Sequence, residues 1–106
     1  MKLQTIERLF LGQILPQKGN LMDMTISAEI QEKLKVTSTE LSAVGYEELG
    51  EGRIGWDTVK DAESTKDFKL TSSEITFLKK CVEKLSESES ITQNVVDLCI
   101  KINKLQ

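Results

Sequence analysis

The 106-residue sequence contains no histidine, which removes the commonest general base and the commonest protein ligand for metal ions. It has two cysteines, too few for a disulfide framework, and a single proline. No run of strongly apolar residues is longer than three, so no segment is predicted to span a membrane. The chain does not open with a cleavable leader pattern. We therefore expect a cytoplasmic protein.

Composition and charge narrow the class further. The sequence is 39% apolar and 29% charged, with both signs mixed, which is typical of a folded chain rather than a disordered one. Its length predicts one domain over residues 1–106. The net charge of −3 argues against a nucleic-acid binder that relies on bulk positive charge.

The first third of the chain predicts two helices. Apolar residues with helical spacing predict one helix over 5–15, ended by Pro16. A second helix is favoured over 21–36, with Asn20 as its N-cap. Alternating apolar residues at its start leave a short strand open there.

Three further helices are predicted by capping boxes, in which a hydroxyl caps the third amide of a helix and a Glu or Gln side chain reaches back. The boxes are Thr37 with Glu40, Thr71 with Glu74, and Ser90 with Gln93. They predict helices over about 38–44, 71–86 and 90–105. Because a short polar connector separates the last two, we expect them to pack as an antiparallel pair.

The middle of the chain differs from both ends. Residues 45–70 hold four of the six glycines and the only Trp and Tyr. The segments 46–49, 53–59 and 67–70 are predicted to be short strands around turns. A small antiparallel hairpin or meander laid against the helices is therefore expected, which makes the fold class a mostly helical α+β domain.

Negative charge is concentrated in the same region. Residues 40–67 carry eight acidic and three basic side chains, a net charge of −5, whereas each end of the chain is +1. This segment is either a solvated face or a surface for a basic protein partner. The candidate partner-binding residues are Tyr46, Glu47, Glu48, Glu51, Trp56, Asp57 and Asp61. Trp56 is interpreted as a core residue or as a contact residue of that surface.

Patterns that would indicate catalysis or ligand binding are incomplete. Gly50, Gly52 and Gly55 form a GxGxxG pattern, but strand-like residues follow it and nearby carboxylates would repel a phosphate, so hairpin-turn glycines are predicted. Asp57, Asp61 and Glu63 lack the glycine and terminal glutamate of a calcium loop. The sequence therefore predicts no enzyme, no cofactor and no metal site.

The two cysteines are predicted to be buried, reduced thiols. Cys81 and Cys99 fall on or beside the apolar faces of the last two predicted helices. In an antiparallel pair they would be offset along the axis by ~4.5 Å, in addition to an interaxial spacing of ~8–10 Å. That placement is unfavourable for a disulfide, which needs Cα atoms within roughly 7 Å.

Short motifs along nearly the whole chain resemble one family. They are Glu7-Arg8-Leu9-Phe10-Leu11, Ile14-Leu15-Pro16, Lys18-Gly19, Thr37 to Leu41, Gly55-Trp56-Asp57 and Thr71 to Ile75. In this order they resemble small uncharacterised proteins of tailed bacteriophages and prophages. The resemblance implies a viral origin, a host-cytoplasm setting and an accessory protein that works by binding, and it assigns no role to any residue.

Three functions follow as hypotheses. The first is a non-enzymatic phage-type accessory protein that binds a host or phage protein, for example as an inhibitor of a nucleic-acid-handling or defence factor. The second is a virion-assembly or scaffold component that self-associates through its closing helices. The third is a helix-turn-helix DNA-binding regulator built from residues 1–39, which their net charge of only +1 disfavours.

Overall fold

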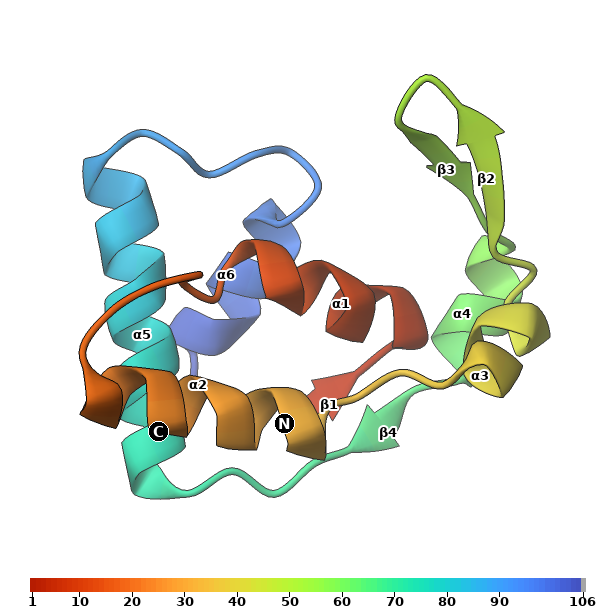
Figure 1. Ribbon diagram of the computed structural model, residues 1–106. Helices are drawn as coiled ribbons and strands as arrows, with labels where there is room; N and C mark the ends of the chain where they lie inside the picture. Colours follow the sequence, from red (N-terminus) through yellow and green to blue (C-terminus); the bar gives the residue numbers. More distant parts are fainter. Residues whose placement is uncertain (106) are drawn as a thin grey trace.

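The computed structural model describes residues 1–105 and shows the predicted fold class, a mostly helical α+β architecture with two small antiparallel sheets (Figure 1). The elements in chain order are β1 (Lys2–Leu3), α1 (Thr5–Phe10), the 3-10 helix η1 (Leu11–Gln13), α2 (Leu21–Lys33), α3 (Ser38–Ala43), β2 (Glu47–Gly50), β3 (Arg53–Gly55), α4 (Thr58–Glu63), β4 (Lys66–Asp67), α5 (Ser72–Glu87) and α6 (Val96–Asn103).

Three predicted helix starts are confirmed. The Asn20 side chain accepts a hydrogen bond of 2.8 Å from the amide of Asp23, and α2 is helical from its first residue, so no strand forms there. The capping boxes at Thr37 and Thr71 are both complete. These caps satisfy amides that have no partner within their own helix, which is why a local sequence pattern was sufficient to predict them.

The third predicted capping box is wrong. The Ser90 hydroxyl lies 2.9 Å from that of Ser88, and the helix begins only after Val95, which has no side-chain cap. Val95 is buried and Ile91 packs against the core. Burying apolar side chains of this size stabilises by ~1.5–3 kcal/mol each, whereas an N-cap contributes ~1 kcal/mol. Core packing therefore decides the path of residues 91–95.

The core lies among the longer helices. α2 packs on α5, α5 packs on α6, and α6 returns beside α5 in the opposite direction, as predicted (Figure 1). The buried cluster consists of Leu3, Leu11, Ile14, Leu15, Ile30, Leu34, Phe77, Leu78, Cys81, Val82, Val95, Leu98, Cys99 and Ile102. Both cysteines are free thiols, and burial raises the pKa of each.

A strand at the start of the chain was not predicted. β1 pairs antiparallel with β4, with Lys2 opposite Asp67 and Leu3 opposite Lys66. Of the strand predicted over 67–70, only Asp67 is in a strand, as the last residue of β4, and the prediction for 68–70 is wrong. Because the two strands are more than sixty residues apart, neither carries the alternation or turn residues that mark a local hairpin.

A buried arginine links α1 to the segments around it. The Nε of Arg8 donates a hydrogen bond of 3.1 Å to the carbonyl of Leu34, and its guanidinium pairs with the Glu40 carboxylate. The same guanidinium lies 4.9 Å from the centre of the Phe68 ring. The hydrogen bond from Arg8 lowers the pKa of Glu40 to about 2.

The middle of the chain differs from its prediction in two ways. The strand predicted over 53–59 ends at Gly55, because Asp57 caps the start of α4, a helix that was not predicted. The hairpin of β2 and β3 does not lie against the helices but projects away from them (Figure 1). It lacks an alternating apolar face that could be buried.

Candidate partner-binding surface

The projecting hairpin ends in a tight two-residue turn. Its strand pairs are Glu47–Gly55, Glu48–Ile54 and Gly50–Arg53. Leu49 is the extra residue of a β-bulge between two of these pairs. At the tip, Glu51 has φ 54° and Gly52 has φ 76°, as in a type I′ turn. The predicted role in a hairpin turn is therefore confirmed for Gly50 and Gly52, whereas Gly55 lies in β3 opposite Glu47. A glutamate at such a φ is uncommon and strained.

Residues 47–55, which we call the acidic arm, contribute nothing to the core. None of them is buried, and every residue of β2 is exposed. The arm contains three acidic side chains, Glu47, Glu48 and Glu51, and one basic side chain, Arg53. Its net charge is therefore −2. The Leu49 side chain is 51% exposed between them. The arm therefore presents three acids, one base and the apolar side chain of Leu49 to solvent.

The base of the acidic arm is held by α3 and the residues that follow it. The amide of Tyr46 donates a hydrogen bond of 3.0 Å to the Leu41 carbonyl, and the amide of Asp57 donates one of 2.8 Å to the Val44 carbonyl. Val44 is completely buried. These hydrogen bonds attach both ends of the arm to a packed part of the molecule. They therefore fix the orientation of the arm, although the arm itself is exposed to solvent.

Trp56 lies where the acidic arm joins the body of the molecule. Its ring meets Phe10 edge to face, with 5.9 Å between ring centres and an angle of 75°. The side chain is only half-buried. Trp56 therefore packs on α1 and also keeps part of its surface accessible to solvent. Its position is consistent with both predicted roles, a packing residue and a contact residue.

Two of the predicted acids have structural roles. The Asp57 side chain accepts hydrogen bonds from the amides of Val59 and Lys60, at 3.0 and 3.1 Å, and so caps α4. Asp61 is 4% exposed and accepts a hydrogen bond of 3.0 Å from the amide of Ile6. Burial raises its pKa, and that hydrogen bond opposes the rise. The expectation that Asp61 belongs to an exposed acidic surface is therefore wrong, because its carboxylate is buried and accepts a hydrogen bond from the first turn of α1.

The seven predicted residues thus divide by position. Glu47, Glu48 and Glu51 lie together on the acidic arm, and Tyr46 and Trp56 lie at its base. Asp57 caps α4, and Asp61 lies within that helix. Sequence reasoning missed Leu49, the exposed apolar residue of the arm. The available signal was a leucine placed between two acids and a glycine, next to the predicted turn.

Comparisons with known proteins give no further assignment. No family model, no curated protein and no solved structure matches the chain. Within residues 1–105, no three His, Cys, Asp or Glu side chains are placed to hold a metal ion. None of the helices described is both long enough and apolar enough to cross a membrane.

Proposed function

We propose that the protein is a non-enzymatic accessory protein that binds a protein partner through the acidic arm. The observation that carries this proposal is that the arm projects from the body, buries none of its residues and exposes three glutamates around Leu49. An apolar residue between charges is the usual arrangement at a binding surface, where the charges steer the partner and the apolar group is desolvated. The partner surface is basic.

The tip of the acidic arm supports this proposal independently. Asn, Asp or Gly is preferred at the first position of a type I′ turn, yet Glu51 occupies it with a positive φ. Strain of this kind costs ~1–3 kcal/mol and is concentrated at functional sites. A carboxylate kept at the most protruding point, at a cost to the turn, is consistent with a role in contacting the partner.

The resemblance to phage-encoded proteins supplies the setting of the proposal. From that resemblance we infer a setting in the cytoplasm of an infected bacterium, where an acidic arm of this shape can occupy a basic groove that otherwise receives nucleic acid. The partner is then a host defence factor or a nucleic-acid-handling factor, and binding inhibits it. Alternatively, the basic groove belongs to another phage protein.

Affinity capture from bacterial lysate tests the proposal. The variant E47K/E48K/E51K should keep its far-UV circular dichroism spectrum and lose its captured proteins, and capture by the wild type should weaken as salt rises. A matched control, E29K/E32K/E63K, makes the same change in net charge at exposed acids outside the arm and should capture normally.

A second variant separates binding from folding. Glu51→Asn places a preferred residue in the turn, so the hairpin should become more stable while capture weakens. Equal capture by the wild type and by the triple reversal would reject the acidic arm as the binding surface. If the triple reversal and the control lost capture equally, the net charge of the protein would explain the loss, and the acidic arm would have no specific role.

A further inference from the structure

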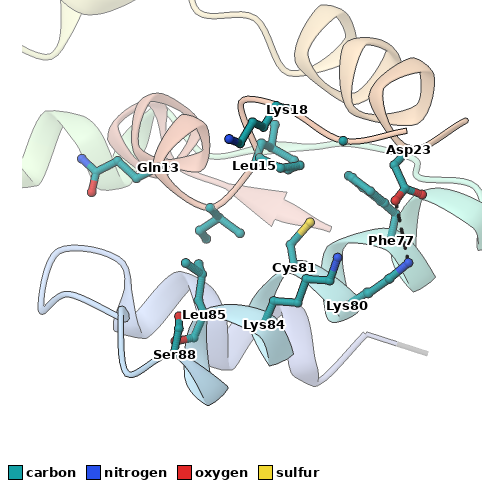
Figure 2. Close-up of a pocket in the computed structure, with 13 residues that line it drawn as sticks. Gln13, Leu15, Lys18, Asp23, Phe77, Lys80, Cys81, Lys84, Leu85 and Ser88 are labelled. Atoms are coloured by element: carbon teal, nitrogen blue, oxygen red, sulfur yellow. Dashed lines mark hydrogen bonds and ion pairs between the residues drawn. The ribbon is translucent and has the colours of Figure 1, made fainter. Parts of the chain in front are cut away.

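A pocket with a positively charged rim lies between residues 13–23 and the second half of α5 (Figure 2). Its apolar lining comes from Ile14, Leu15, Phe77, Cys81 and Leu85. Lys18, Lys80 and Lys84 line the same pocket, and the only acid among its lining residues is Asp23, which lies 3.8 Å from Lys80. The charged groups around the pocket therefore sum to +2.

The size of the pocket indicates the kind of occupant. It encloses about 230 Å³, whereas small-molecule sites usually run to ~300–1,000 Å³. One inserted side chain suits it better than a whole cofactor. Next to it, between the lining residues Gly19 and Asp23, Leu21 and Met22 are 85% and 73% exposed. Exposed apolar residues beside an apolar pocket are typical of a surface that binds a protein segment.

The acidic arm has the complementary properties. It presents Leu49 beside Glu48 and close to Glu51, with a net charge of −2 against the +2 of the pocket. In Figure 1 the arm and the pocket-forming segments lie on opposite sides of the molecule. Because of this separation, the arm cannot reach the pocket of its own chain.

We propose that the acidic arm of one copy docks in the lysine-rimmed pocket of a second copy. Leu49 enters the apolar lining, and Glu48 and Glu51 face Lys18 and Lys84. This inference rests on the proposed function, since the same arm is the docking element. It identifies the lysine-rimmed pocket as the surface to which the arm binds. The two surfaces differ, so the contact is heterologous, and copies join head to tail in a ring or an open chain.

Sedimentation velocity over a concentration series tests this association. The wild-type mass should rise above the 11.9 kDa of one chain as concentration increases, and should fall back as salt is added. Leu49→Ala should weaken association by about tenfold, the loss expected for an anchoring side chain. The matched control is Val59→Ala on α4, a substitution at another exposed apolar residue, which should associate like the wild type.

Charge reversal makes the test specific to these two surfaces. The arm variant E48K/E51K and the pocket variant K18E/K84E should each stay monomeric, because like charges then face each other. Lys80 is left in place, since it pairs with Asp23. The combined variant restores opposite charges and the wild-type net charge of −3, so it should associate again.

Three results would overturn the inference. They are a wild-type chain that stays monomeric at all concentrations, association that survives both reversals, and a folded combined variant that remains monomeric. The proposed function is judged separately by capture. A monomeric chain whose arm still captures a basic protein would retain the proposed function and reject the second copy as its partner.

Discussion

The carboxylate of Asp61 holds the first turn of α1 in place. It accepts a hydrogen bond from the amide of Ile6, and the neighbouring Ser64 hydroxyl accepts hydrogen bonds from the amide and hydroxyl of Thr5 at 3.3 and 2.8 Å. The first amides of a helix have no partner within the helix. Here α4 and the residue after it supply those partners, so a distant segment caps α1.

Two substitutions at this position separate the hydrogen bond from the charge. Asp61→Ala leaves the Ile6 amide unpaired and should lower the free energy of unfolding by ~1–3 kcal/mol. Asp61→Asn keeps an oxygen acceptor and removes a charge that burial disfavours, so it should cost less. Urea denaturation at pH 7 measures both. Equal losses would mean that the acceptor oxygen contributes nothing.

The helices are held by the faces that they bury, and α6 allows a direct test. Leu98 is 2% exposed in the core, whereas Ile100, two residues later, is 49% exposed. Leu98→Ala should cost ~2–5 kcal/mol of unfolding free energy, the usual penalty for truncating a buried leucine. Ile100→Ala is the matched control and should change it by less than ~1 kcal/mol. A similar denaturation midpoint in both variants would contradict the assigned face.

Across the whole molecule, two carboxylates, the half-buried Glu40 and the buried Glu74, join segments that are distant in sequence. Glu40 pairs with Arg8 and Lys66, and Glu74 pairs with Lys33 at 2.6 Å. Burial alone would raise the pKa of Glu74, but the hydrogen bond from Lys33 and those at Thr71 outweigh it, and the pKa is lowered. Both groups therefore stabilise the fold in their charged forms.

These lowered pKa values predict sensitivity to acid. A carboxyl whose pKa is lower in the folded than in the unfolded state contributes stability above its unfolded pKa, and that stability is lost as pH falls towards the folded value. For Glu40 the window runs from 4.5 down to about 2. Glu40→Gln should therefore cost roughly 3 kcal/mol at pH 7 and flatten the stability profile below pH 4.5.

Urea denaturation between pH 7 and pH 2.5 measures this effect. Glu47→Gln, at an exposed acid of the arm, is the matched control and should leave the profile close to that of the wild type. Asp61 has the opposite effect on the pH dependence. Because its pKa is raised in the folded state, its ionisation as pH rises lowers the stability of the fold. If the unfolding free energy of Glu40→Gln changed with pH as it does in the wild type, the ion pair between Glu40 and Arg8 would not be the cause of the acid sensitivity.

Features that span only a few residues follow from the local amino-acid pattern. Asn20, Thr37 and Thr71 each accept a hydrogen bond from the amide three residues ahead, so these caps need only contacts within four residues of the chain. The glycines beside Glu51 likewise determined the position of the turn. The concentration of acids in the middle of the chain was also visible without a structure.

The exposure of those acids and the start of α6 depend instead on packing between segments that are distant in sequence. Asp61 is buried against the first turn of α1, and Ser90 fails to start a helix because Val95 is buried and Ile91 packs against the core. The pairing of β1 with β4 and the rim of lysines around the pocket also join distant segments. Such contacts depend on loop closure and packing across the whole chain, which no short pattern encodes.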